Sequence, residues 1–345
     1  MHDQFLKIGI FLGRYKFARA LTRQLFDYQH LSLKQGVAGI SFENPVGLSA
    51  GFDKDGNLLN IIPELGFGYA QIGTITFKPY KGNPKPRLYR LPKSKAIVVY
   101  YGLKGEGVKK VLVKIKRARP SLLKQGISIG KTNAPYTKSM TAGVKDYTDC
   151  LREVIKSGVG DFYTINISCP NTFGGEPFGT PEKLEKLLKK LATLKYSKPL
   201  FLKMPIDLPW PEFDKLLKVS LHYNVTGVVI GNVTKARDKN LIKDVIPENV
   251  RGGISGRPTW ERSNMLISKT YQKYGKKLVI VGVGGIFSAE DAYEKIQRGA
   301  SLVQVITGMI YEGPQLIGEI NRGLVKRMKR DGFKTIGEVV GTKTY

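Results

Sequence analysis

The feature that most constrains the fold is a regular alternation that runs from about residue 45 to the C-terminus. Short apolar runs rich in β-branched residues alternate with longer segments of helical periodicity, which is typical of parallel βα units. The expected strands are 47–51, 69–74, 127–131, 162–168, 200–204, 227–232, 278–282 and 302–307. The expected helices include 181–193, 211–223, 288–298 and 315–329.

Eight alternating units predict an α/β fold, a (β/α)8 TIM barrel with a short N-terminal helical extension. An open, doubly wound sheet is the alternative. The length of 345 residues suits one barrel with a small appendage. We therefore expect an extension over residues 1–36 and a barrel domain over residues 37–345.

The extension has apolar residues at helical spacing with basic residues between them, which predicts one or two amphipathic helices suited to an anionic membrane. A helix packed on the barrel would show the same periodicity. No apolar run reaches the ~20 residues that span a bilayer, and the interspersed charges argue against a secretory signal. We expect a cytoplasmic protein, peripheral on the cytoplasmic face of the membrane. The apolar residues are Phe5, Ile8, Phe11, Leu12, Tyr15, Ala18, Leu21, Leu25 and Phe26, and the basic ones Lys7, Arg14, Lys16, Arg19 and Arg23.

The net charge of +28 favours anionic partners, such as a membrane surface, a phosphate-bearing cofactor or a carboxylate substrate. The lysines are spread through the expected helices and are not interleaved with aromatic residues, so no nucleic acid is expected as a partner. The two cysteines, Cys150 and Cys169, are too few for a disulfide framework or a Cys-rich metal site. No metal is expected.

Barrels of this kind build their sites at the carboxyl ends of the strands, often with a phosphate after the seventh and eighth. Here the stretch 281–286 (VGVGGI) surrounds the end of the seventh strand, and Ile306, Thr307 and Gly308 end the eighth. Glycines let backbone N–H groups approach a phosphate, although ordinary turns also use them. No strand–GxGxxG–helix unit lies near the N-terminus, so a mononucleotide such as FMN fits better than NAD.

The most specific stretch is 166–172 (NISCPNT), at the end of the expected fourth strand. Its Asn166 and Asn171 can donate to and accept from a planar heterocycle, and Cys169 between them is placed to exchange a proton. Nucleophilic catalysis by the thiol needs a partner base, but none of the three histidines lies at the carboxyl end of a strand. A buried structural thiol would not explain the flanking amides.

This stretch resembles the active-site signature of the dihydroorotate dehydrogenase family. Further stretches match that family in order: 49–56 (SAGFDKDG), 72–76 (IGTIT), 82–88 (GNPKPRL), 252–258 (GGISGRP), 281–286 (VGVGGI) and 299–304 (GASLVQ). The resemblance covers about residues 37–325. It implies a barrel enzyme that uses FMN to oxidise dihydroorotate to orotate in pyrimidine biosynthesis.

Carried over residue by residue, the resemblance implies that Cys169 takes a proton from ring C5 while hydride leaves C6 for flavin N5. Lys54 and Lys203 also make independent sense, because a cation stabilises negative charge on a flavin or a carboxylate. The implied FMN contacts are Ala50, Gly51, Lys54, Thr74, Ser128, Asn166, Lys203, Gly231, Gly256, Gly285, Ile306 and Thr307. The implied substrate contacts are Lys54, Val99, Tyr100, Tyr101, Gly102, Leu103, Asn166, Asn171, Asn232 and Val233.

Three polar positions depart from the family pattern. Val99 stands where an orotate-binding Asn is usual, Val233 where a Thr is usual, and Ser128 where an FMN-binding Asn is usual in the quinone class. Loss of a hydrogen bond to a buried polar ligand costs about 1–3 kcal/mol. Either Tyr100, Tyr101 and Lys104 compensate, or the ligand is another cyclic amide or enone.

The chain also mixes the classes of the family. Residues 1–36 and the stretch SAGFDKDG resemble the membrane-associated quinone class, which usually has a serine base, whereas Cys169 and the stretch 174–179 (GGEPFG) resemble the soluble NAD-linked class. We expect a quinone as electron acceptor, with NAD or fumarate as alternatives. A flavin-binding protein without turnover is disfavoured, because Cys169 and the amides around it are all retained.

Overall fold

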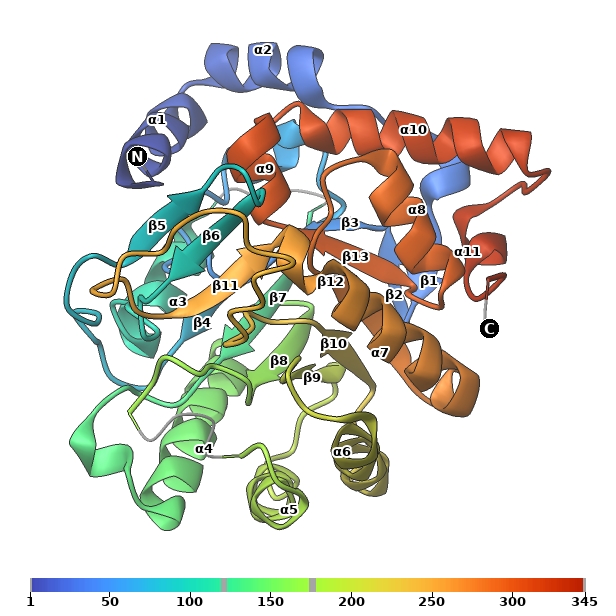
Figure 1. Ribbon diagram of the computed structural model, residues 1–345. Coiled ribbons are helices and arrows are strands. Elements are labelled where there is room, and N and C mark those ends of the chain that lie inside the picture. Colours follow the sequence, from blue (N-terminus) through green and yellow to red (C-terminus); the bar gives the residue numbers. More distant parts are fainter. Residues whose placement is uncertain (1, 119–122, 174–177, 344–345) are drawn as a thin grey trace.

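The structure, a computed structural model, describes residues 2–118, 123–173 and 178–343, with side chains from residue 6 onward. The expected (β/α)8 barrel is confirmed, because eight parallel strands pair in chain order and the last pairs with the first (Figure 1). The strands are β3 (Val46–Leu48), β4 (Tyr69–Ile75), β7 (Lys124–Ile129), β8 (Phe162–Asn166), β9 (Leu200–Met204), β10 (Gly227–Ile230), β12 (Val279–Val283) and β13 (Leu302–Val305).

Helices surround the barrel, and a few short ones lie in the loops (Figure 1). Several expected strands run past the observed ends, notably 47–51, 162–168 and 302–307, because the chain leaves the barrel there to form loops. The α-helices are α3 (Val108–Arg117), α4 (Met140–Ser157), α5 (Pro181–Leu191), α6 (Trp210–His222), α7 (Trp260–Tyr274), α8 (Ala289–Gln297), α9 (Thr307–Glu312), α10 (Leu316–Arg330) and α11 (Ile336–Val339). The 3-10 turns are η1 (Leu31–Leu33), η2 (Ile62–Leu65), η3 (Pro135–Thr137) and η4 (Arg257–Thr259).

The amino-terminal half of the barrel interior is filled by aromatic rings opposite glycines. Side chains on a strand alternate between the two faces, so residues that pair across neighbouring strands share the interior space. A hairpin of β1 (Gln35–Val37) and β2 (Ile40–Phe42) adds Phe42, whose ring centroid is 5.4 Å from that of Tyr69. The paired residues are Tyr69 with Gly47, Phe162 with Gly126 and Phe201 with Gly227.

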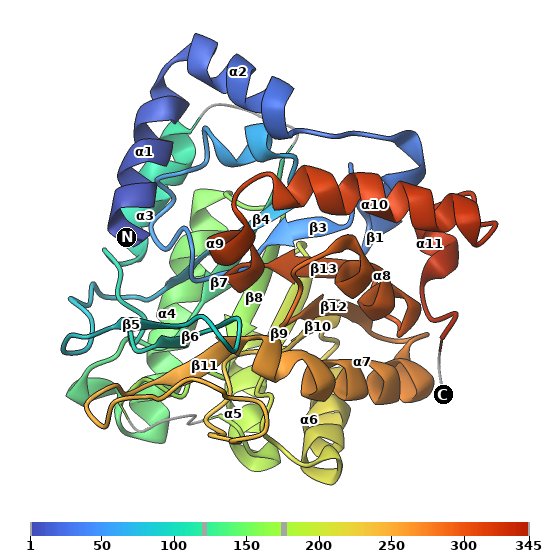
Figure 2. The same cartoon turned by 45° about the horizontal axis from the view of Figure 1, so that its top comes forward.

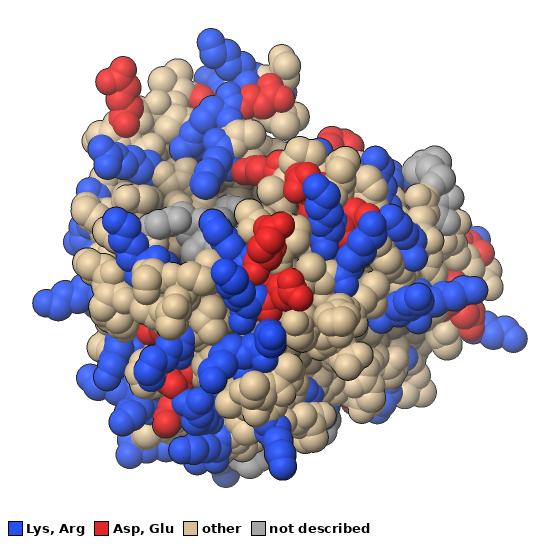
Figure 3. Space-filling model, turned by 90° about the horizontal axis from the view of Figure 1, so that it is seen from below, with Lys and Arg blue, Asp and Glu red and all other residues tan. Residues whose placement is uncertain are grey.

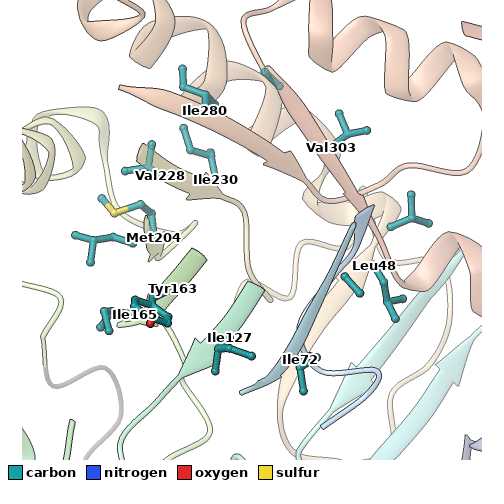
Figure 4. Packing of buried hydrophobic residues seen from close by; sticks show 14 of the residues in the cluster. Leu48, Ile72, Ile127, Tyr163, Ile165, Met204, Val228, Ile230, Ile280 and Val303 are labelled. Carbon is teal, nitrogen blue, oxygen red and sulfur yellow. The ribbon is translucent and has the colours of Figure 1, made fainter. Parts of the chain in front are cut away.

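The outward faces of the strands form the main core against the helices (Figure 4). Ile72, Ile127 and Val303 on this face are fully buried. The interior towards the carboxyl ends is instead polar, since Lys203 and Asn166 are buried there. Apolar side chains therefore stabilise the barrel on its outer face and in the amino-terminal half of its interior. The polar side chains of Lys203 and Asn166 lie at the carboxyl end, where a site is expected.

The N-terminal extension contains two helices, α1 (His2–Arg14) and α2 (Lys16–Phe26), at one edge of the molecule (Figure 1 and Figure 2). A Cβ at Gly9 would lie 2.8 Å from Leu58 Cδ2, so α1 approaches the barrel loops closely through this glycine. Arg23 of α2 pairs with Glu64 at 2.7 Å. The helices end at Phe26, and residues 35–36 already belong to β1. The side chain of Phe5 lies outside the described residues.

A second, antiparallel sheet was not expected from the sequence. It consists of β5 (Leu88–Leu91), β6 (Ala96–Val99) and β11 (Gly253–Gly256), with β6 in the middle. Leu91, Val98 and Ile254 form a small core of their own. β5 and β6 belong to the segment that follows barrel strand β4, whereas β11 belongs to the segment that follows β10. The sheet therefore joins these two segments over the carboxyl end of the barrel.

None of the helices among the described residues is long and apolar enough to cross a membrane. Lysine and arginine side chains are distributed over the face shown in Figure 3, with acidic side chains between them. This agrees with the expected spread of the positive charge and shows no single basic patch on that face.

Substitution of Gly47 by alanine tests the packing of the barrel interior. A Cβ there would lie 2.2 Å from Cζ of Tyr69, and this ring is held by a 3.0 Å hydrogen bond from its hydroxyl to the Val303 carbonyl. We expect Gly47→Ala to lower the free energy of unfolding by about 1–3 kcal/mol in urea denaturation. Gly36→Ala is the control, because a Cβ there meets nothing within 4 Å. Equal denaturation midpoints for both variants would contradict this packing.

Candidate active site

A cavity lies at the carboxyl end of the barrel, beneath the antiparallel sheet. Its walls come from the ends of barrel strands, including Thr74, Asn166 and Lys203, and from Ile97 and Ser255 of the sheet. The cavity encloses about 1060 Å³ of space, part of it open to solvent. Concave spaces of this kind, at the carboxyl end of a barrel, are the usual place for a ligand.

Most residues that the sequence analysis assigned to a cofactor line this cavity. They are Ala50, Gly51, Lys54, Thr74, Asn166, Lys203, Gly231 and Ile306. Four others lie outside the lining. Ser128 is behind Thr74, with 2.9 Å between their hydroxyl oxygens, and Thr307 is 2.7 Å from the Ser255 hydroxyl. Gly256 and Gly285 directly follow Ser255 and Gly284, which do line the cavity.

The residues assigned to the base and substrate are also brought together. Cys169, Lys54, Val99, Tyr101, Gly102, Leu103, Asn166, Asn171, Asn232 and Val233 all line the cavity. Tyr100 does not, because it follows Val99 at the end of β6 and alternation turns it to the other side. Lys104, proposed to compensate for missing amides, lies in the lining, together with Leu88 and Ile97, which sequence reasoning did not single out.

Asn166, the last residue of β8, is fixed by a hydrogen-bond chain that joins neighbouring strand ends. Its Nδ2 donates to Thr74 Oγ1 at 2.9 Å, and its Oδ1 accepts from the Ser168 hydroxyl at 3.2 Å. Asn232 Nδ2 in turn donates to the carbonyl and the hydroxyl of Ser168, both at 2.7 Å. The side-chain amides of Asn166 and Asn232 are therefore pre-positioned before any ligand arrives.

Three lysines, Lys54, Lys104 and Lys203, line the cavity and give it a positive character. Lys203 lies beside Asn166 in the β8–β9 register and is almost fully buried. Burial lowers the pKa of Lys203 to about 8, and the nearby Cys169 partly opposes this shift by stabilising the ammonium. Lys54 places its ammonium 4.1 Å from the centroid of the Tyr101 ring. Groups of this kind favour an anionic or electron-rich ligand.

The glycine turn after β12 is shaped for close backbone approach. Gly284 and Gly285 have φ values of +110° and +72°, which side-chain-bearing residues rarely adopt. A Cβ at Gly284 would lie 2.6 Å from Thr259 Oγ1, and one at Gly285 would lie 2.9 Å from Trp260 Cβ. The turn adjoins Ile306 in the cavity wall, at the strand pair where barrels of this type hold a phosphate.

Two buried asparagines, Asn83 and Asn133, clasp the loop that carries Cys169. Asn133 Nδ2 donates to the Gly102 carbonyl at 3.1 Å and to Asn83 Oδ1 at 3.0 Å, and its own Oδ1 accepts from the Phe173 N–H at 2.6 Å. Asn83 Nδ2 donates to the Asn171 carbonyl at 2.9 Å. The base loop and the loop that follows β6 are thus tied together through side chains.

Sequence reasoning missed this clasp. Asn83 lies inside the GNPKPRL match, but nothing in that stretch predicts that its side-chain amide connects two loops. Asn133 comes just after the expected third strand. The stretch 174–177 of the expected soluble-class loop lies outside the described residues. Among the residues that the structure does describe, no group of three His, Cys, Asp or Glu side chains could hold a metal ion.

The three departures from the family pattern have different surroundings. The valines Val99 and Val233 both line the cavity, and the apolar side chains of Ile97 and Leu103 also belong to its wall. The Val99 carbonyl accepts from Asn171 Nδ2 at 2.8 Å. Ser128 still supports Thr74, as described above. Lys54, Tyr101 and Lys104 also line the cavity and carry polar groups.

Comparisons with known proteins agree on one family. The sequence profile described as "Dihydroorotate dehydrogenase" matches residues 32–328. "Dihydroorotate dehydrogenase (quinone)" of Nostoc punctiforme is 40% identical, over 90% of this chain and 83% of that protein. The protein of the same name from Acaryochloris marina is 36% identical, over 99% of this chain and 94% of its own length. The crystal structure of DHODH from Eimeria tenella in complex with ferulenol superposes with a TM-score of 0.86 at 27% identity, covering 99% of this chain and 94% of that one.

Removal of the Asn133 side chain should loosen the loop that carries Cys169. In Asn133→Ala the Phe173 N–H loses its acceptor, a loss of about 1–3 kcal/mol. We expect the amide of Phe173 to exchange with deuterium roughly tenfold faster or more. Asn240→Ala, at an exposed position in another loop, is the control. Unchanged protection of residues 169–173 in Asn133→Ala would show that the clasp does not hold this loop.

Proposed function

The chain belongs to the dihydroorotate dehydrogenase family, and from this membership we propose that it oxidises dihydroorotate to orotate, with FMN as its flavin and a quinone as electron acceptor. One observation carries the proposal. Cys169 and the amides of Asn166, Asn171 and Asn232 line one cavity together with the buried Lys203. This is a proton acceptor and a set of ring-binding groups at the carboxyl end of a barrel.

The residues of the cavity fit a flavin mononucleotide. Gly284 and Gly285 carry no side chain, so backbone N–H groups of this turn can approach a phosphate, and Lys203 supplies a buried positive charge in the lining. When bound, the flavin accepts the hydride that leaves the substrate. Lys203 stabilises the negative charge that develops on the ring, and the hydrogen-bonded pair of Thr74 and Asn166 orients it.

Cys169 is the proposed base, and its Sγ takes the proton from C5 of the substrate ring. The buried ammonium of Lys203 and a thiolate at Cys169 stabilise each other, which favours the charged pair inside the cavity. Asn171 and Asn232 hold the ring so that C5 faces the sulfur. Positioning of this kind matters because proton transfer needs contact distance between base and substrate.

The carboxylate of dihydroorotate is assigned to the cationic side of the cavity. Val99 and Val233 offer no side-chain hydrogen bond, so Lys54 and Lys104 are the groups in the lining that can pair with a carboxylate there. The apolar wall around Val99 also favours a second candidate, a related flavoenzyme acting on another cyclic amide or enone. Failure of orotate to bind at millimolar concentration, with FMN fully loaded, would favour this second candidate.

The two N-terminal helices are assigned to the membrane and the quinone. Phe11, Phe17 and Leu25 are exposed by 57%, 79% and 64% of their surface. Basic residues, including Lys16 and Arg19, lie between them in the sequence. Exposed apolar side chains flanked by basic ones suit the interface of an anionic bilayer, where a quinone is dissolved. We assign the protein to the cytoplasmic face of the membrane as a peripheral protein.

Replacement of the proposed base tests the mechanism. We expect Cys169→Ala to slow anaerobic reduction of the bound flavin by dihydroorotate by roughly 10²–10⁴-fold, the usual size of a general-base contribution. The measurement is the loss of flavin absorbance after rapid mixing. Cys150→Ala is the matched control, because this second cysteine is fully buried in α4 and does not line the cavity. Equal rates in the two variants would place the base elsewhere.

The same preparation tests the cofactor. Wild-type protein should purify yellow with about one FMN per chain. Cys169→Ala should keep its FMN, because the thiol is assigned to the substrate side of the cavity. A colourless protein that does not take up added FMN would refute the proposed activity as a whole.

Charged substitutions on α2 test the membrane assignment. We expect Phe17→Glu combined with Leu25→Glu to weaken binding to anionic vesicles and to lower turnover with a membrane-dissolved quinone by roughly tenfold or more, since each buried apolar side chain contributes about 1.5–3 kcal/mol. Flavin reduction by dihydroorotate should not change. Val245→Glu is the control, because Val245 is 87% exposed but lies in a different loop. Full quinone turnover in the double variant would favour a soluble acceptor.

A further inference from the structure

Lys295 is a fully buried lysine that the proposed mechanism does not use. It lies on α8 and has no exposed surface. Its Nζ donates to Ser263 Oγ at 2.6 Å and to Asn264 Oδ1 at 2.8 Å, and it lies 4.5 Å from the centroid of the Trp260 ring. These three partners all belong to α7, so the lysine spans the space between two helices of the outer ring.

The partners of Lys295 are neutral, which is unusual for a buried cation. Within the described part of the chain, no carboxylate lies within ion-pair distance of its Nζ. Asp291, the acidic group of the same helix that acts most strongly on Lys295, is held by Arg257 through two bonds of 2.9 and 3.0 Å. Burial of an ammonium without an opposite charge is costly, so an anion close by would stabilise the arrangement.

The site of such an anion follows from what Lys295 touches. A Cβ at Gly282 would lie 3.3 Å from Lys295 Cδ, and one at Gly284 would lie 3.4 Å from Ser263 Oγ. Trp260 packs against Gly285 in the same way, as described above. Lys295 and its partners therefore form the outer wall of the glycine turn, and Gly284 of that turn faces the cavity on the other side.

We propose that the ammonium of Lys295 is a positioning charge for the phosphate of FMN, acting from behind the glycine turn and selecting the phosphorylated flavin over riboflavin. This inference rests on the proposed function, because it needs a flavin in the cavity. The lysine does not touch the phosphate. It acts through the field of a buried charge, which is weakly screened inside a protein.

The pH dependence of FMN binding follows from the charges around Lys295. Burial lowers its pKa to about 7, an effect reinforced by Arg298 and Arg257 and opposed by Asp291 and Glu261. Without a ligand, the ammonium is present below pH 7 and is lost as the pH rises through 7. A bound phosphate favours the ammonium, so FMN binding takes up a proton and weakens as the pH rises above 7. Below that window the second ionisation of the phosphate, near a pKa of about 6, has the opposite effect.

A comparison of FMN with riboflavin distinguishes the effect of the Lys295 charge from the effects of the other groups in the site. Lys203, whose pKa is also lowered, faces the cavity where the ring is assigned, so its titration affects FMN and riboflavin alike. Riboflavin lacks the phosphate, so its affinity should not respond to the charge on Lys295. The ratio of the two dissociation constants therefore reports on the phosphate end alone.

The experiment compares wild type, Lys295→Met and Lys295→Arg, each freed of flavin and titrated with FMN and with riboflavin between pH 6.5 and 9. Binding is followed by the quenching of flavin fluorescence. We expect Lys295→Met to weaken FMN binding by roughly tenfold or more, as for unit charges several ångströms apart at intermediate dielectric, and to leave riboflavin binding unchanged. Lys295→Arg should retain more of the preference for FMN. Calorimetry of the wild type in two buffers of different ionisation enthalpy should show greater proton uptake with FMN than with riboflavin, because Lys203 contributes equally to both and Lys295 only to FMN.

Two results would overturn the inference. Equal weakening of FMN and riboflavin in Lys295→Met would show that the lysine only packs the two helices, and an unchanged affinity for both would show no role at all. If Lys295→Met does not fold, the wild-type measurements still decide, because equal proton uptake with FMN and with riboflavin refutes the proposal. Failure of the wild type to bind either flavin is a distinct outcome, since it refutes the proposed function itself.

Discussion

Closure of the parallel sheet is the constraint on which the rest of the molecule depends. β13 pairs with β3 through Val303 and Val46, so no strand edge remains in the barrel. The closed interior has little space at its amino-terminal half, where each large ring lies opposite a glycine. Towards the carboxyl ends the interior instead holds Lys203 and Asn166, which reach the cavity. The position of the site is thus a result of how the barrel is filled.

Two buried lysines define the electrostatics of this end of the barrel. Lys203 lies inside the barrel, and Lys295 lies outside it, behind the glycine turn. Burial lowers the pKa of both groups, because water no longer solvates the ammonium. Burial thus disfavours the ammonium at both places, and an anionic ligand close by would favour it. We have proposed that Lys203 serves the ring of FMN and Lys295 its phosphate.

The substrate side is organised by side-chain ties between loops. Asn133 connects Gly102 with Phe173, and Asn83 connects to Asn171, so the loop with Cys169 cannot move independently of the loop after β6. The loop after β6 also carries Lys104, and Val99 is the last residue of β6. Val99 departs from the family pattern, and Lys104 is one of the residues expected to compensate for it. A change in ligand contacts at one loop is therefore mechanically coupled to the position of the base on the other.

The sequence by itself determined the barrel, because its strands and helices follow local periodicity, and it placed NISCPN at the end of β8. Cys169 and Lys54 could be expected at one end of the barrel because they follow parallel strands, whereas Asn232 was assigned to the site only through the resemblance to the family. The sequence did not reveal the pairing of β11 with β6, the clasp by Asn133 or the burial of Lys295. Each of these joins segments distant in the chain, and such contacts leave no local pattern. They were decided only by the tertiary structure, in which the closed barrel brings the loops and the outer helices together.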